Sequence, residues 1–278
     1  KRTLASALAL GLLAGGFMGL KARIDRMPRR KIPGSGIIYI PSGKYLKMAT
    51  FGFSAVLADI IYIWAIQYYG NPAIEDRYEH LTHIFSIISE LDPPYVDPYI
   101  VGALIAIEDT GDVGLALKIL DAGLDKNPGQ WIFPFEAGHY AQLYLKDHAL
   151  AKEYYRKTME IPGAPGIAKR LYAASSFKAN DLQTAWETWL EVYETASDPQ
   201  IRKIASNHLY QVKAAADAGI VREAVGRFRT AYGRNPAVLE DLVRAGILAG
   251  VPKDYDEKDY LYDPETGEIK TQVIPWKR

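Results

Sequence analysis

The feature that most constrains the fold is a repeat with a period close to 34 residues. Three segments share the pattern Asp-x-x-x-Ala, and their alanines, Ala116, Ala151 and Ala185, are separated by 35 and 34 residues. A bulky apolar residue follows each alanine by four positions and a proline closes each unit: Leu120 and Pro128, Tyr155 and Pro162, Trp189 and Pro199. This punctuation predicts helix–turn–helix units that stack as a solenoid, because no single unit can bury its apolar face alone.

The match is best over residues 97–130, at Gly111-Asp112, Ala116, Leu120, Gly123 and Pro128. This stretch resembles the tetratricopeptide repeat in its inter-helix turn and second helix, although the family's usual Trp and Leu-Gly are absent from its first helix. Weaker copies lie on either side: Leu81, Phe85 and Pro93 before it, and Ala224, Phe228, Ala231 and Pro236 after the others. The resemblance covers residues 53–236 and implies an all-α, right-handed solenoid of about five repeats.

The resemblance also implies a binding surface, because the first helix of each tetratricopeptide repeat lines a concave groove for peptides or partner proteins. Carried over by position, the second repeat contributes Val101, Ile105 and Glu108. The predicted partner-binding residues come from the third and fourth repeats: Glu136, Tyr140, Tyr144, Arg170, Phe177 and Lys178. Tyrosines, a phenylalanine and mixed charges suit protein contact. The alternative is that some of these side chains belong to the core between repeats.

Near the start of the chain, Leu4 to Leu20 carries no charge and is followed by a run of basic residues. Seventeen apolar or small residues lie at the short end of the range for a membrane span. We expect residues 1–27 to be a retained transmembrane anchor with a basic collar, the alternatives being a signal peptide or an amphipathic surface helix. The layout suggests a single-pass protein of the bacterial inner membrane with an extracytoplasmic solenoid, although the basic residues after the span favour the opposite orientation.

Two features of this segment predict contacts. Small residues recur every four positions at Ala7, Gly11, Gly15 and Gly19, a pattern that lets another transmembrane helix approach closely, or that follows simply from the abundance of Gly and Ala. The collar offers cations to anionic lipid head groups, and its predicted lipid contacts are Arg23, Arg26, Arg29 and Arg30.

Proline and glycine interrupt residues 28–52, which we expect to be an extended connector. The apolar run from Phe53 to Ile66 is too short for a second span and contains Asp59, so it predicts a helix buried in a soluble core.

Residues 237–278 form a predicted cap, in which Asp263 to Gly267 is a turn sequence between two short strands of a hairpin. The segments Tyr232-Gly233-Arg234-Asn235-Pro236 and Tyr262-Asp263-Pro264-x-Thr266-Gly267-Glu268 are similar to the end of pseudopilins and related pilus or secretion proteins. Convergent turn chemistry is the alternative.

The sequence offers little catalytic chemistry. The 278 residues include no cysteine, which excludes disulfides and thiolate-based sites, and 33 basic against 33 acidic residues lack the basic excess of nucleic-acid binders. His80 and His83 share a helix face, but no third metal ligand converges on them in the sequence. We therefore expect no enzyme activity, cofactor, metal, nucleic acid or small-molecule substrate.

The predicted function is a membrane-anchored scaffold, assembly factor or accessory subunit. Its expected partners are membrane lipids and other subunits of a membrane complex, including a transmembrane helix. The alternatives are a component of pilus or secretion machinery and, last, a metal-dependent hydrolase.

Overall fold

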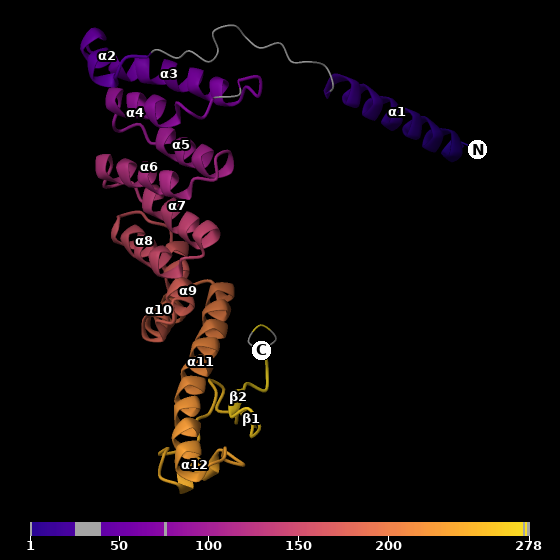
Figure 1. The fold of residues 1–278 in the computed structure, drawn as a ribbon, viewed down its shortest axis with the longest axis vertical. Coiled ribbons are helices and arrows are strands. Elements are labelled where there is room, and N and C mark those ends of the chain that lie inside the picture. The colour runs from indigo at the N-terminus through magenta and orange to yellow at the C-terminus, as the bar shows by residue number, and fades with distance from the viewer. Residues whose placement is uncertain (1, 26–39, 75–76, 275, 277–278) are drawn as a thin grey trace. The chain divides into compact units, whose positions relative to one another are not determined.

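The computed structural model describes residues 2–25, 40–74, 77–274 and 276, without the side chains of residues 2–10, 12, 24 and 25. The described chain is mostly helical and carries one small antiparallel sheet, as the sequence predicts (Figure 1). It divides into two compact units, residues 1–92 and 93–278.

The first unit contains α1 (Arg2–Asp25), α2 (Gly43–Ala49), α3 (Ser54–Tyr69) and α4 (Leu81–Leu91). Both α2 and α3 pack against α4. The prediction of an extended connector over residues 28–52 is wrong for the part that forms α2, while residues 28–39 lie outside the described residues. Gly43 accounts for the close packing of α2 on α4, because a Cβ at this position would lie 2.6 Å from the Cβ of Glu90.

The segment predicted to be the anchor forms the helix α1. Among the described residues, none of the helices combines the length and the apolar character needed to cross a membrane. The transmembrane span over residues 1–27 is therefore not supported by the structure and stays a prediction.

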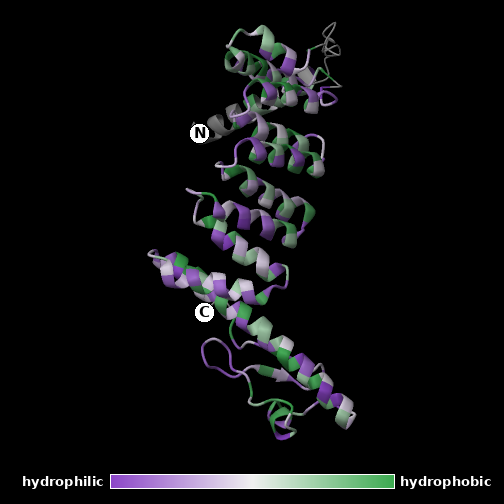
Figure 2. Ribbon diagram, turned by 90° about the vertical axis from the view of Figure 1, so that its left-hand side faces the viewer, coloured by the Kyte–Doolittle hydropathy of each residue, from purple (hydrophilic) through white to green (hydrophobic). Residues whose placement is uncertain are grey.

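The second unit begins with a series of helices in which each packs against the next. They are α5 (Asp97–Glu108), α6 (Val113–Lys126), α7 (Ile132–Tyr140), the π-helix η1 (Ala141–Leu145), α8 (His148–Glu160), α9 (Ile167–Lys178), α10 (Leu182–Thr195) and α11 (Pro199–Tyr232). Hydrophobic and hydrophilic residues are interleaved along these helices (Figure 2), as expected where one face packs and the other meets solvent.

The aspartates of the sequence repeat cap the second helix of each repeat. Asp112, Asp147 and Asp181 each accept a hydrogen bond from the backbone N–H three residues later, at distances of 2.8, 2.9 and 3.2 Å. A capping aspartate satisfies a helix N–H that would otherwise lack a partner. Each follows a residue with positive φ, and these residues are Gly111, Lys146 and Asn180.

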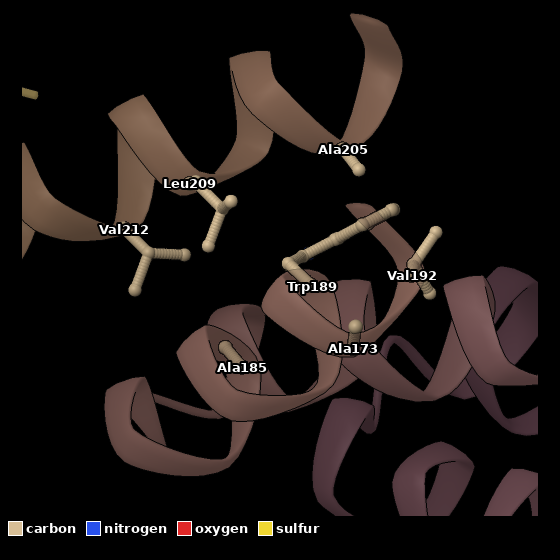
Figure 3. Close-up of a cluster of buried hydrophobic side chains, with 7 residues drawn as sticks. All are labelled: Ala173, Ala185, Trp189, Val192, Ala205, Leu209 and Val212. Carbon is tan, nitrogen blue, oxygen red and sulfur yellow. The ribbon is translucent and has the colours of Figure 1, made fainter. Parts of the chain in front are cut away.

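The alanines and bulky residues of the repeat form the core between helices. Ala116, Ala151 and Ala185 are fully buried, as are the residues four positions later, Leu120, Tyr155 and Trp189. Figure 3 shows Trp189 of α10 reaching toward Ala205 of α11, in a cluster that also contains Leu209.

The longer of the two repeat spacings coincides with η1, whose π-helical turn accommodates one added residue.

The predicted fifth repeat is not a pair of helices. Residues 199–232 form the single helix α11, and no turn residue interrupts it. Its first half packs against α10, while its second half packs through Val225 and Phe228 against Leu239 and Leu242, the last of these in α12 (Glu240–Arg244). The tail thus covers an apolar face that a further repeat would otherwise cover.

The predicted hairpin is confirmed. Strands β1 (Leu261–Asp263) and β2 (Glu268–Lys270) pair antiparallel with Tyr262 opposite Ile269, and Gly267 supplies the positive φ that the turn requires. Two buried acids fasten the tail to α11. Asp254 accepts from the Tyr210 hydroxyl at 2.9 Å, and the Tyr260 hydroxyl donates to Asp217 at 2.6 Å.

Candidate partner-binding surface

The predicted residues of the third repeat lie together with Glu108 of the second. Tyr144 is 46 % exposed on η1, and its hydroxyl donates to Glu108, whose carboxylate raises the pKa of Tyr144. Its ring meets the ring of Tyr140 edge-on, with 5.9 Å between centroids. Tyr140 is buried, and burial together with the charge of Glu136 raises its pKa to about 12. Tyr144 is thus the exposed member, and Tyr140 belongs to the core.

Glu136 lies half-buried on α7 with one carboxylate oxygen 3.7 Å from Nδ1 of His139. His139 in turn packs edge-on against Phe135. Glu136 therefore lies beside the aromatic core of the third repeat.

Arg170 lies apart from the other predicted residues of α9. It lines a cavity of about 490 Å³ between the start of α9, the end of α10 and the start of α11, with Lys169, Asp198 and Ile201 among the other lining residues. Phe177 and Lys178 are at the opposite end of the same helix. The structure therefore divides the predicted fourth-repeat set between two sites.

Phe177 and Lys178 line a smaller cavity of about 130 Å³ that draws on four elements, η1, α8, α9 and α11. Its other lining residues are Gln142 of η1, His148 of α8, Ala174 and Ser175 of α9, and His208 and Gln211 of α11. Lys178 is exposed at this cavity and Phe177 is half-buried. We call this site the α9 pocket.

Two buried polar atoms in the α9 pocket lack hydrogen-bond partners among the described residues: Nδ1 of His148 and Oγ of Ser175. Ser175 is 2 % exposed. A buried hydroxyl without a partner costs roughly 1–3 kcal/mol. A polar group that enters the pocket would therefore recover hydrogen bonds that the protein itself leaves unmade.

The α11 wall of the pocket is built on aromatic packing. His208 stacks on Trp189 with 4.0 Å between ring centroids, and the ring of Trp276 meets it edge-on at 4.9 Å. Burial lowers the pKa of His208, partly opposed by a hydrogen bond with Gln211. His208 is therefore neutral at physiological pH, and Lys178 supplies the positive charge of the pocket.

Sequence reasoning missed six of the eight pocket residues: Gln142, His148, Ala174, Ser175, His208 and Gln211. His148 is the first residue of α8, the second helix of its repeat, and the predicted groove used only the first helix of each repeat. It also missed a groove of about 700 Å³ between α10 and α11, lined by Trp186, Leu190 and Val212 beside Lys213 and Asp217. The apolar spacing along α10 is the signal that could have indicated this groove.

The predicted contacts of the N-terminal segment are placed only in part. Gly11, Gly15 and Gly19 lie on α1, and no described atom would lie within 4 Å of a Cβ added at any of them beyond the helix's own backbone. Arg23 is exposed at the end of this helix. The side chain of Ala7 and the residues Arg26, Arg29 and Arg30 lie outside the described residues.

The histidines considered as metal ligands do not converge with a third ligand. His83 contacts the backbone carbonyl of Ile40 at 2.9 Å, and His80 precedes the first residue of α4. Across the part of the chain that the structure describes, no group of three His, Cys, Asp or Glu side chains could hold a metal ion.

No model of a known protein family matches this chain, and no curated protein sequence matches it either.

Proposed function

We propose that this chain is a membrane-anchored, tetratricopeptide-like scaffold, assembly factor or accessory subunit that acts without catalysis. In this proposal the N-terminal segment of residues 1–27 holds the protein at a membrane, and the right-handed stack of helices presents a surface to another subunit of the complex. The residues central to that surface are Tyr144, Phe177 and Lys178.

The observation that carries the proposal is the α9 pocket. It draws side chains from η1, α8, α9 and α11, so its shape depends on the stacking of successive units rather than on any one of them. It combines an apolar ring, Phe177, with a cation, Lys178, and with the unpartnered polar atoms of Ser175 and His148. Such a mixture suits a protein segment that carries an acidic or amide side chain.

The experiment is a pull-down of the tagged full-length chain from native membranes in mild detergent, with bound proteins identified by mass spectrometry. Lys178→Glu reverses the charge of the pocket, and because Lys178 is exposed the variant should fold normally. We expect a partner that the native chain recovers to be reduced several-fold by Lys178→Glu. Arg170→Glu should weaken the same partner if the contact extends along α9 to the larger cavity.

Lys118→Glu is the matched control, because Lys118 is an exposed lysine of α6 and does not line the pocket. It should recover the partner as well as the native chain does. Equal recovery by Lys178→Glu and Lys118→Glu, with both variants showing the helical content of the native chain, would place the contact elsewhere.

The transmembrane part of the proposal has its own test. Replacement of Gly11, Gly15 and Gly19 by leucine should leave the protein in the membrane fraction but release it from the complex, because bulky side chains prevent close helix approach. Unchanged co-purification would contradict the packing role of these small residues.

A second candidate function, a component of pilus or secretion machinery, draws on the tail. Its hairpin packs against α11, where Gly267 lies so close to Val225 that a Cβ at Gly267 would be 2.8 Å from the valine side chain. The identity of the proteins recovered in the pull-down separates this function from the first.

A further inference from the structure

The first unit has an apolar surface that its own helices leave uncovered. One face of α3 packs inward through Ala58, Ile61 and Ala65, which are buried. The opposite face carries Phe53, Val56, Ile60 and Ile63, each more than half exposed. A solvent-facing helix surface normally carries polar residues, so this helix is apolar on both sides.

The turn between α2 and α3 extends this surface. Phe51 is 91 % exposed, and it lies in the left-handed region with φ of 50°, followed by Gly52 with φ of 98°. A non-glycine residue in this region costs roughly 1–2 kcal/mol, so the turn holds an unfavourable conformation. Its result is an exposed aromatic ring at the turn, three residues after the exposed Met48 at the end of α2.

The side chains that border this surface are of the type found where a protein meets a bilayer. Tyr45 is 69 % exposed on α2, and Trp64 is at the margin of the apolar face of α3. Tyrosine and tryptophan concentrate at the head-group level because their rings are apolar at one end and polar at the other. Lys44 is exposed on α2 and can reach anionic head groups, whereas the ammonium of the exposed Lys47 donates to the backbone carbonyl of Glu90 at 3.4 Å.

One exposed charge of α3 limits how deep the helix can lie. Asp59 is about 80° around the helix from the middle of the apolar face, at 100° per residue. This position keeps its carboxylate at the water side of a helix that lies flat in the interface.

In the proposed function the N-terminal anchor brings this surface near the membrane. Only residues 26–39 and the first few residues after them separate α1 from α2. These seventeen residues, 26–42, reach at most about 60 Å when fully extended, at about 3.5 Å for each residue. This linker is rich in basic residues, which favour an anionic surface. A tether of this length makes contact with the same bilayer effectively intramolecular.

We propose that Met48, Phe51, Phe53, Val56, Ile60 and Ile63, here named the α2–α3 surface, lie in the interfacial layer of a lipid bilayer. The inference rests on the proposed function, since it uses the N-terminal segment as the tether. Burial of six apolar side chains in the interface, with Lys44 at the head groups, strengthens the membrane binding that the anchor provides. The first unit is then fixed against the membrane instead of hanging from a linker.

The test uses the absence of cysteine from the chain, which allows one spin label at a single introduced cysteine in the full-length protein. The informative variants are Phe51→Cys and Ile63→Cys. Thr82→Cys is the control, because Thr82 is exposed on α4 of the same unit. Leu13→Cys reports on the anchor. The labelled proteins are reconstituted in phosphatidylcholine vesicles with about a quarter phosphatidylglycerol, which supplies the anionic surface.

The measurement is the ratio of the collision rate with oxygen, which concentrates in lipid, to the collision rate with a water-soluble nickel complex. We expect this ratio to be several-fold higher at Phe51→Cys and Ile63→Cys than at Thr82→Cys. Because all these positions are exposed, the labels should leave the fold intact, and circular dichroism checks that they do.

The outcomes separate the inference from the proposed function. A lipid-exposed label at Leu13 with water-exposed labels at Phe51 and Ile63 would overturn the inference and leave the anchor in place. Labels at Phe51 and Ile63 that neither oxygen nor nickel reaches would also overturn it, because that pattern means protein covers the surface. If Leu13 is water-exposed, the anchor fails, and lipid exposure at Phe51 and Ile63 would still support the α2–α3 surface.

Discussion

Helices α3 and α10 place similar residues in opposite environments. Each carries a tryptophan beside other apolar residues, but Trp189 of α10 is 2 % exposed whereas Trp64 of α3 is 36 % exposed. Trp189 is held between α9 and α11 in one cluster. Trp64 stacks on Tyr68 of its own helix, with 5.2 Å between ring centroids.

The difference follows from the number of neighbours that each helix has. Helix α10 packs against both α9 and α11, whereas α4 is the main neighbour of α3 among the described elements. A helix with a packed element on each side buries apolar residues on both faces. A helix with a single neighbour leaves the apolar residues of its other face exposed. Apolar composition alone therefore does not indicate burial within the chain. The uncovered face of α3 is the one that we propose to lie in the lipid interface.

The largest expected effect tests this contrast directly. Trp189→Ala should reduce the local stability of the second unit by about 3–5 kcal/mol, because it leaves a large cavity between three helices. Trp64→Ala should cost under about 1 kcal/mol in detergent, because the ring is partly exposed. Native-state hydrogen exchange of the α9–α11 and α3–α4 amides measures both, since it resolves the opening of each unit. Similar losses at the two sites would show that exposure in the structure is not what separates them.

The sequence predicted the helical units well because their turns and core positions repeat. The spacing of Ala116, Ala151 and Ala185 marked the buried positions, and each proved fully buried. The prediction of a fifth repeat was wrong because Ala224 and Phe228 keep the core spacing without a turn before them. Helix α11 runs through this region unbroken. A core pattern fixes which face is packed, whereas a helix boundary needs its own local signal.

The candidate site was less predictable than the fold. The positions taken from the tetratricopeptide resemblance included Tyr140, which is buried, and Arg170, which lines a separate cavity. A pocket that joins η1, α8, α9 and α11 depends on how the repeats stack, and the sequence of a single repeat does not determine the distances between stacked repeats. The unpartnered Oγ of Ser175 could be recognised only after the packing was known.

A smaller effect concerns the helix caps that set the unit boundaries. Asp147→Ala should destabilise α8 by about 1 kcal/mol, because the backbone N–H of Leu150 loses its acceptor. Asp147→Asn should retain most of the stability, since the amide oxygen can accept the same hydrogen bond. Asp125→Ala is the control, because Asp125 is exposed within the last turns of α6 and caps no helix start. Hydrogen exchange of the first turn of α8 reports the difference, and equal protection in the Asp147→Ala and Asp125→Ala variants would refute the capping role.

The smallest expected effect concerns His208, which stacks on Trp189 in the α11 wall of the pocket, and the dependence of stability on its protonation. Burial holds the pKa of His208 below its ordinary value of 6.5, so the unfolded chain binds a proton more readily than the folded chain. The stability that neutral His208 contributes is therefore complete above pH 6.5 and declines as the pH falls from there toward the lower folded-state pKa.

Urea denaturation followed by tryptophan fluorescence, at about pH 7.5 and about pH 5, measures this loss because the His208 imidazole of the unfolded chain gains a proton between these two pH values. Replacement of the imidazole in His208→Asn removes the proton-binding group, so the variant should lose less stability than the native chain between the two pH values. His139→Asn is the matched control, since His139 lies outside the His208–Trp189 stack. If His208→Asn and the native chain lose the same stability on acidification, then the proton is not taken up at the stacked imidazole, and the acid sensitivity of this unit lies in its other titratable groups.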